Sequence, residues 1–407
     1  MERNSEQMLA NVSVLDISNL IAGPGISTIL ADFGADVIKV EHPKTGDYIR
    51  NWGHKKNGIP LAWKSHGRGK RLLSVNLNTA EGQKIIRKIA SHVDVMIESY
   101  RPGKLEEWGL DYETLSADNP KLILIRVSGW GQTGPYRDRP GFGTLAEAFS
   151  GFAHITGQAD GPPTLPSFAL ADGIAALVGT YAVMMALYYR DVQNRPGQII
   201  DLSIFEPIFA VLGPQAIEYD QLGIIQQRFG NRSPRGVPRN AYQTSDGRWV
   251  AISAFASDMA LRLFRAMGRD DMLEDPRYNT AANRLENGDV VDGIVADWMK
   301  QYPLKEVLDR LEEYEVPVAP VYDIAQIMHD PQYQARQAIT QIPDEDLGAV
   351  KMTNIPVKFS LTPGKIRHSG RTAIGHDTVA ILKSIGINDR EIEELIDKKI
   401  VMRPEGR

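Results

Sequence analysis

One carboxylate, Asp172, stands directly before a long apolar stretch. Residues 173–190 are almost all apolar or small, which predicts a largely buried helix with Asp172 at its N-cap. The free main-chain N–H groups and the positive dipole end of such a helix would keep the carboxylate ionised. An ionised, partly desolvated carboxylate is the nucleophile needed for attack on an activated acyl group. Asp is also a common helix cap without a chemical role, so this pattern alone leaves both interpretations open.

Cationic residues form three clusters near the ends of predicted strands. The clusters are Arg68 with Lys70 and Arg71, Arg101 with Lys104, and Arg137 with Arg139. Ligands bind at the carboxyl ends of strands in open α/β sheets, and cations there could hold phosphate groups. Each cluster taken singly is also typical of a solvated surface loop.

The elements that must position these residues indicate an α/β fold. Apolar runs at 12–17, 35–41, 93–97 and 121–127 predict strands, with helical segments between them. This alternation favours a parallel, Rossmann-like sheet. The turn at 22–25 lacks the third glycine of a dinucleotide fingerprint and is more typical of a structural turn than of nicotinamide binding.

The second half of the chain has a different pattern. Residues 204–222 predict a mostly apolar helical connector, interrupted near Gly213-Pro214, and 241–253 predict a hairpin with Asp246-Gly247 at its turn. We therefore expect a large domain and a smaller α+β domain joined by two connectors. Their expected bounds are 1–203 with 345–407 for the large Rossmann-like domain, 226–325 for the small domain, and 204–225 and 326–344 for the connectors.

Composition excludes several classes of function. The 407 residues are 43% hydrophobic and 24% charged, which is ordinary for a soluble protein. The net charge of −5 does not indicate the excess of basic residues that is typical of proteins that bind nucleic acid. The absence of cysteine excludes thiol nucleophiles, thiolate metal sites and disulfides. The eight histidines form no HxH or HExxH pattern, so we expect no metal. No signal-peptide pattern or uninterrupted apolar run of about 18 residues is present, so we expect a cytoplasmic protein without a membrane partner.

Motifs along nearly the whole chain carry a family resemblance. The main ones are SGWGQTGP at 128–135, RPGF at 139–142, GPP at 161–163, Asp172 at a helix start, and GQIID at 197–201. In this order they resemble the class III CoA-transferases, the family of formyl-CoA transferase and carnitine CoA-transferase. The resemblance extends over 14–24, 34–41, 69–71, 101–103, 230–234, 246–248, 316–321 and 375–378.

The resemblance implies a CoA-transferase that moves CoA from an acyl-CoA thioester to a carboxylic acid. Asp172 would be its nucleophile, forming first a mixed anhydride and then an aspartyl-CoA thioester. No tightly bound cofactor is implied, because CoA and acyl-CoA are substrates. The donor and acceptor stay open, since family members use small dicarboxylates, carnitine-type acids or aromatic acids, and the transfer could also be intramolecular.

The resemblance also implies the CoA contacts. They fall on Ile21, Ala22, His42, Val75, Asn76, Ser99, Tyr100, Arg101, Pro140, Gly141, Phe142 and Gly143, to which the cationic clusters add Arg71, Lys104 and Arg139. Glu107 occupies a position that is usually basic in the family, so Arg101 or Lys104 would take over its phosphate contact. A loop at Gly230-Asn231 would close over the intermediates, although the family's run of consecutive glycines is absent here.

Two alternative functions follow from the same residues. The α-methylacyl-CoA racemases share the implied fold and pair the aspartate with a histidine in a GHD motif, but this chain has Gly141-Phe142-Gly143. An aromatic hydrocarbon cannot relay a proton, and His154 is more typical of a core or surface residue than of a replacement base. A non-catalytic CoA-binding protein is the other alternative, and the retained Asp172 argues against it.

The resemblance further implies an interlocked homodimer, in which each chain threads through its partner. The 204–222 segment carries more apolar surface than an exposed linker tolerates, so a partner chain would bury it. The same connectors also fit a two-domain monomer.

Overall fold

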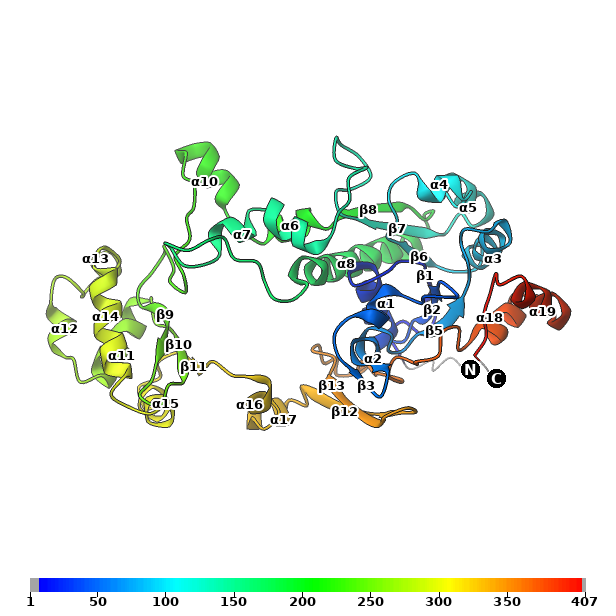
Figure 1. The fold of residues 1–407 in the computed structure, drawn as a ribbon. Coiled ribbons are helices and arrows are strands. Elements are labelled where there is room, and N and C mark those ends of the chain that lie inside the picture. Colours follow the sequence, from blue (N-terminus) through cyan, green and yellow to red (C-terminus); the bar gives the residue numbers. More distant parts are fainter. Residues whose placement is uncertain (1–6, 405–407) are drawn as a thin grey trace. The chain divides into compact units, whose positions relative to one another are not determined.

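The computed structural model describes residues 7–404, which belong to two compact units (Figure 1). The first unit runs to Phe152 and includes Pro166–Gly213 and the chain from Gln334 onward, and the second comprises Ala153–Leu165 and Pro214–Tyr333. The chain passes between the units at 213/214 and 333/334, which lie inside the two expected connectors. That Ala153–Leu165 joins the second unit is not suggested by the sequence.

The centre of the first unit is a parallel sheet of six strands in the order β5-β2-β1-β6-β7-β8. This is the third-second-first-fourth-fifth-sixth order of Rossmann folds, in which the topology reverses beside the first strand. The expected α/β fold with a parallel sheet is therefore confirmed. The strands are β1 (Ser13–Asp16), β2 (Asp36–Glu41), β5 (Arg71–Ser74), β6 (Val95–Glu98), β7 (Ile123–Ser128) and β8 (Ile199–Ser203).

Helices cover both faces of this sheet, which is why its strands are continuous apolar runs. Val14, Val95 and Ile125 face one way and pack with α1 (Ala22–Asp32) and α8 (Leu170–Val192). Their strand neighbours Leu15 and Met96 face the other way and pack with α3 (Ala80–Ala90), α18 (Thr378–Ser384) and α19 (Asp389–Asp397). Figure 1 shows these two helical layers.

The long helix α8 differs from its prediction in two respects. It begins at Leu170 with Ala169 at the N-cap, so that Asp172 lies in the first turn and does not cap the helix. Its outer face is exposed, with Leu177 at 62% and Met185 at 66%, so the prediction of a largely buried helix is wrong for the single chain. By length and composition α8 could cross a membrane, but core helices meet the same criteria, and its inner face packs on α1 and the sheet.

The remaining elements of the first unit are short. They are η1 (Tyr48–Asn51), β3 (Lys55–Lys56), β4 (Ile59–Pro60), α2 (Leu61–His66), α4 (Lys104–Glu107), α5 (Tyr112–Asp118), α6 (Gly143–Phe149), α9 (Phe205–Ala210), β12 (Ile339–Asp344) and β13 (Gly348–Thr353). Two further helices, α7 (Phe152–Ile155) and α17 (Pro331–Ala335), span the points where the chain changes unit.

The second unit contains a three-stranded antiparallel sheet, in the order β11-β10-β9, packed against helices. The hairpin expected around Asp246-Gly247 is confirmed, with Trp249 opposite Gln243. The break expected near 213–214 is also present, between α9 and α10. The elements of this unit are α10 (Gln215–Leu222), β9 (Arg239–Gln243), β10 (Trp249–Ser253), α11 (Ser257–Ala266), α12 (Asp271–Glu274), α13 (Ala281–Glu286), α14 (Gly288–Met299), α15 (Leu304–Glu313), β11 (Val318–Pro320) and α16 (Ile324–Ile327).

Candidate active site

Asp172 is a half-buried carboxylate in the first turn of α8. Burial raises its pKa to about 6, the negative charge of Glu147 adds to this, and a hydrogen bond from its own main-chain N–H opposes it only in part. The expectation that the helix end keeps this carboxylate ionised is thus wrong below about pH 6. Desolvation and a neighbouring carboxylate outweigh the helix dipole here.

Gly143, the first residue of α6, lies directly beneath this carboxylate. A Cβ atom at Gly143 would come within 2.0 Å of the Asp172 Oδ2 atom, so only glycine allows the approach. The preceding residue, Phe142, caps α6 and is 58% exposed. The Gly141-Phe142-Gly143 segment that was singled out in the sequence is therefore in contact with the candidate nucleophile through Gly143.

Three separate motifs meet around the start of α6. Gly129 and Gly141 bring two loops so close that a Cβ at Gly129 would lie 2.5 Å from the Gly141 Cα atom. The Trp130 indole N–H donates to the Pro140 carbonyl at 3.0 Å, which fixes the same contact. The Asp201 carboxylate, on β8, accepts the Gln132 main-chain N–H at 3.0 Å. Residues far apart in the sequence thus hold the loop that leads to Gly143.

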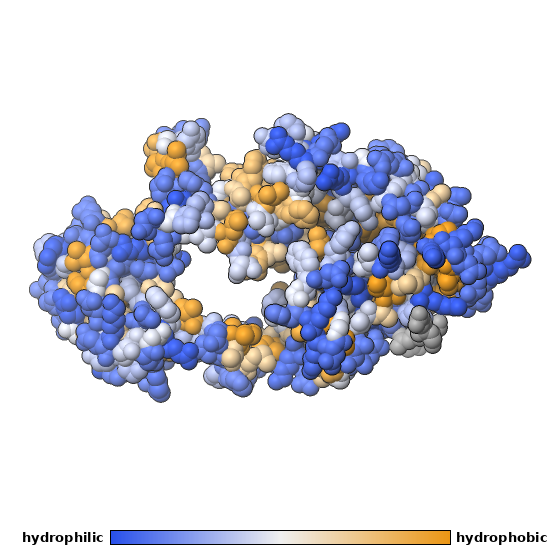
Figure 2. Space-filling model, in the orientation of Figure 1, coloured by the Kyte–Doolittle hydropathy of each residue, from blue (hydrophilic) through white to orange (hydrophobic). Residues whose placement is uncertain are grey.

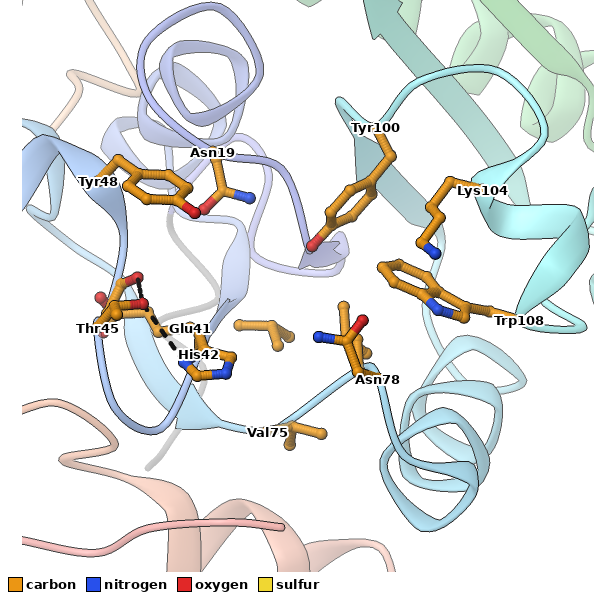
Figure 3. A pocket seen from close by; sticks show the side chains of 13 residues that line it. Asn19, Glu41, His42, Thr45, Tyr48, Val75, Asn78, Tyr100, Lys104 and Trp108 are labelled. Carbon is orange, nitrogen blue, oxygen red and sulfur yellow. Dashed lines mark hydrogen bonds between the residues drawn. The ribbon is translucent and has the colours of Figure 1, made fainter. Parts of the chain in front are cut away.

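A cavity of about 350 Å³ opens at the carboxyl edge of the sheet, around the point where the strand order reverses. In Figure 3, Asn19 and Tyr48 face Tyr100, Lys104 and Trp108 across this cavity. It is lined by Asn19, Val40, Glu41, His42, Thr45, Gly46, Tyr48, Val75, Leu77, Asn78, Tyr100, Lys104 and Trp108. Val40 and Glu41 end β2, and the other lining residues follow the ends of β1, β2, β5 and β6. Together they form a ligand cavity of the kind expected at a topological switch point.

Several of the residues expected to contact CoA come together at this cavity. His42, Val75, Tyr100 and Lys104 line it. Asn76, Ser99 and Arg101 are their chain neighbours, and the Ser99 hydroxyl accepts the Asn19 main-chain N–H at 2.9 Å. Sequence reasoning missed the lining residues Asn19, Tyr48 and Trp108. The sequence could have indicated them, because Asn19 follows β1, Tyr48 follows β2 and Trp108 follows β6, as the predicted contacts also do.

The cavity and Asp172 are linked through two helix starts. Ile21, two residues after the lining residue Asn19, caps α1, and Ala22 begins this helix. A Cβ on Gly25 would lie 2.7 Å from the Ala176 Cβ atom, so the first turn of α1 contacts the second turn of α8. Asp172 is therefore one helical turn away from the point where α8 meets α1.

Most of the predicted cations lie elsewhere. Arg71 begins β5 at the amino edge of the sheet and forms an ion pair with Asp36 at 2.6 Å, so the structure does not bring it to the cavity. Arg139 stacks on the Tyr136 ring at 3.7 Å. Lys104 is the predicted cation that lines the cavity, where it pairs with Glu107 at 2.7 Å.

A cluster of buried charges lies beneath the cavity. Asp16 is fully buried, with Lys39 Nζ at 3.6 Å and Lys70 Nζ at 3.5 Å from its oxygens, and it accepts hydrogen bonds from the hydroxyls of Ser18 and Ser27. Burial alone would raise the Asp16 pKa, but the two cations and two hydroxyls lower it. Burial lowers the pKa of Lys70 to about 8. Lys70 thus serves this internal cluster and is not a surface phosphate ligand.

The expected loop at Gly230-Asn231 belongs to the second unit. Gly230 adopts a positive φ of 62° and donates its N–H to the Gly157 carbonyl at 2.8 Å. The Arg239 guanidinium donates to the Asn231 carbonyl at 2.7 Å. Between residues 7 and 404, no three His, Asp or Glu side chains are arranged to hold a metal ion.

Known proteins resemble this chain over almost its whole length. Residues 9–378 match the model of CoA-transferase family III. The chain is 39% identical over 394 residues to succinyl-CoA–D-citramalate CoA-transferase of Chloroflexus aurantiacus, which covers 97% of this chain and 98% of that protein. It is 33% identical to succinate–glutarate CoA-transferase of Agrobacterium fabrum, over 88% of this chain and 91% of that protein. The crystal structure of a CAIB/BAIF family protein from Brucella suis superposes with a TM-score of 0.82 at 30% identity, covering 94% of this chain and all of that one.

Proposed function

The chain belongs to CoA-transferase family III and transfers CoA from an acyl-CoA to a carboxylic acid, and we propose that Asp172 is the nucleophile of this reaction. The observation that carries this proposal is a half-buried carboxylate without a cationic partner among residues 7–404. A carboxylate in such a place is poorly solvated and basic, with a pKa of about 6, and still mostly ionised at neutral pH.

The proposed reaction proceeds by acyl exchange. An Asp172 oxygen attacks the thioester carbon, the C–S bond breaks, and the CoA thiolate carries away the negative charge while a mixed anhydride forms. The thiolate then attacks the Asp172 carbonyl, releasing the donor acid and leaving an aspartyl-CoA thioester. The acceptor carboxylate attacks this thioester, the C–S bond breaks, and a second mixed anhydride forms between Asp172 and the acceptor. The CoA thiolate then attacks the acceptor acyl carbon of this anhydride, which gives the new acyl-CoA and releases the Asp172 carboxylate without hydrolysis. Water must be kept from all of these intermediates.

The cavity at the carboxyl edge of the sheet is our proposed site for CoA. Tyr100 and Trp108 offer aromatic surfaces for the adenine ring, and Lys104 offers a cation for phosphate. The contact between the first turn of α1 and the second turn of α8 supports a path for the pantetheine arm from this cavity toward Asp172. We propose further contacts at Ile21, Ala22, His42, Val75, Asn76, Ser99, Arg101 and the segment 140–143.

Succinyl-CoA is the proposed donor, and a short dicarboxylic acid is the proposed acceptor. Relatives with 33–39% identity are named for succinyl-CoA or succinate paired with citramalate, malate, glutarate or mesaconate. Purified protein should be incubated with succinyl-CoA and each acid, and the acyl-CoA products identified by mass spectrometry. Exchange with aromatic or carnitine-type acids but not with dicarboxylates would contradict this substrate class.

We propose that the protein transfers CoA without racemising the acyl group, because Phe142 cannot relay a proton. Its phenyl ring stands where the racemases have a histidine, and it offers no group that could return a proton to an α-carbon. The protein should not wash deuterium from solvent into the α-carbon of a 2-methylacyl-CoA. Incorporation at the rate of CoA exchange would overturn this assignment.

A homodimer is the proposed assembly, with the outer face of α8 as part of its interface. Leu177, Tyr181, Met185, Tyr188 and Val192 form an exposed apolar stripe along this helix. On the face drawn in Figure 2, further apolar side chains gather over α10, which lies in one of the two connectors. We propose that the connectors thread through the partner, as the family resemblance implies. A folded monomer in light scattering at nanomolar concentration would rule this arrangement out.

The loop at Gly230-Asn231 is our proposed cover for the intermediates, and the Gly230 N–H would have to leave the Gly157 carbonyl before it could donate to an oxyanion. We also propose that the protein acts in the cytoplasm and holds no cofactor tightly.

Substitution of the nucleophile tests the central proposal. Asp172→Asn should abolish CoA exchange while the protein stays folded, because an amide oxygen of similar shape is a far weaker nucleophile. Asp191→Asn is the matched control, since Asp191 lies on the same helix, is exposed and pairs with Arg190. Full exchange by Asp172→Asn would show that another group performs the attack.

A further inference from the structure

We propose that Glu147 is a positioning residue for Asp172, an inference that rests on the proposed role of Asp172 as nucleophile. Its carboxylate holds the first turn of α8 in place, and its charge favours the acylated, uncharged form of Asp172. Glu147 lies on α6, four residues after the glycine that Asp172 contacts. The sequence did not single it out.

The first part of this role is structural. Ala169, the N-cap of α8, has no side-chain acceptor for the free N–H groups of the first turn. Glu147 supplies one from a neighbouring helix, since its Oε1 atom accepts the Ala171 N–H at 3.1 Å. Ala171 precedes Asp172, so this bond fixes the main chain that carries the nucleophile.

The second part is electrostatic. Glu147 is only 2% exposed, and no ion pair joins it to a cation in the described part of the chain. The three helices α6, α8 and α9 pack together here. Among their other charged groups, Glu206 accepts the Ser203 hydroxyl, and Arg190 and Asp191 pair at the far end of α8. The charge of Glu147 therefore acts on Asp172 without a neutralising partner, in agreement with the raised pKa of that carboxyl.

Acylation removes this repulsion. When an Asp172 oxygen bonds to the acyl carbon and the C–S bond breaks, the negative charge passes from the carboxylate to the departing thiolate. Two like charges close together then become one, and the enzyme with acylated Asp172 is favoured relative to the free enzyme. The repulsion is present in the free enzyme and absent from the acylated intermediate, so it should affect kcat more than the binding of acyl-CoA.

Glu147→Gln separates the two parts of the role. The glutamine amide oxygen can still accept the Ala171 N–H, but the charge is gone. We expect kcat to fall about tenfold, the acid limb of the kcat/KM profile to move to lower pH by about one unit, and KM for acyl-CoA to stay the same. The melting temperature should be unchanged. Glu113→Gln, on the exposed surface of α5, serves as a control and should change none of these.

Glu147→Asp keeps the charge but shortens the side chain, and it guards against a Gln variant that fails to fold. This variant should keep the acid limb near its wild-type position while turnover falls. An unchanged acid limb and unchanged kcat in Glu147→Gln, or equal shifts of the limb in both variants, would overturn the electrostatic role. Loss of exchange in Asp172→Asn without any effect of Glu147→Gln contradicts only this inference, whereas exchange retained in Asp172→Asn contradicts the proposed function itself.

Discussion

Two aspartates in the first unit illustrate opposite uses of a buried carboxylate. Asp16 is fully buried at the end of β1, yet its pKa is lowered because Lys39, Lys70 and two hydroxyls surround it. Asp172 is less buried, yet its pKa rises to about 6, because no cation within the described chain offsets the effect of burial and the nearby carboxylate of Glu147 adds to it. The partners of a carboxylate, more than its depth, thus decide whether it stabilises the fold or stays reactive.

The difference also has a structural cause. Asp16 and Lys39 are direct neighbours in the register of β1 and β2, so the pairing of the strands brings the opposite charges together. Asp172 is held by a helix start and a glycine contact that bring no cation to it. The first arrangement belongs to the framework beneath the proposed CoA cavity, and the second to the proposed chemistry.

The largest expected effect comes from removing the charge of Asp16. Asp16→Asn would leave Lys70 buried without its ion-pair partner, while Lys39 keeps its pair with Asp47 at 3.0 Å, so we expect a loss of about 3–5 kcal/mol in the free energy of unfolding. Chemical denaturation monitored by circular dichroism measures this. Asp36→Asn, which breaks the more exposed pair with Arg71, is the matched control and should cost about 1 kcal/mol or less. Equal losses in the two variants would contradict the special role of the Asp16 cluster.

Asp172→Asn should change stability in the opposite direction. Because the pKa of Asp172 is higher in the folded than in the unfolded chain, its stabilising contribution is present below about pH 4 and is lost as the pH rises through 6. The asparagine variant escapes this loss, so between pH 4 and pH 7 it should gain up to about 3 kcal/mol over the wild type. Thermal melts of both proteins at the two pH values test this. A difference in stability between the two proteins that does not grow with pH would contradict the desolvation of the Asp172 carboxylate.

The rate of CoA exchange should depend on pH in the same range. The nucleophile must be ionised, so kcat/KM should fall about tenfold per unit below a midpoint near pH 6, the pKa of Asp172 in the free protein. Initial rates of CoA exchange, measured between about pH 4.5 and about pH 8, would locate this midpoint. A midpoint near 4, the ordinary value for an aspartate, would mean that Asp172 is not desolvated during catalysis.

The smallest expected effect lies at the rim of the cavity. Glu107 pairs with Lys104 there, and both side chains are partly exposed. Glu107→Gln should free the lysine for phosphate and lower KM for acyl-CoA about two- to threefold, with less effect at high salt. Steady-state kinetics at two ionic strengths would show this. A higher KM would indicate that Glu107 itself supports binding.

Local sequence patterns predicted much of the fold but only part of the site. Apolar runs predicted the β1-α1-β2 unit, and Asp246-Gly247 predicted the hairpin of the second unit, since both depend on residues close in the chain. The role of Glu147 as an acceptor for the first turn of α8 could not be predicted, because it comes from another helix. The burial of Lys70 was missed for the same reason, as its partner Asp16 lies 54 residues away.

The formation of a covalent enzyme–CoA thioester tests the central claim most directly. The protein should be incubated with succinyl-CoA, treated with hydroxylamine or borohydride, digested and mapped by tandem mass spectrometry. We predict a modification at Asp172 alone, absent from Asp172→Asn and present in Asp191→Asn. Modification of a different carboxylate, or turnover by the wild type with no trapped adduct at Asp172, would contradict the account.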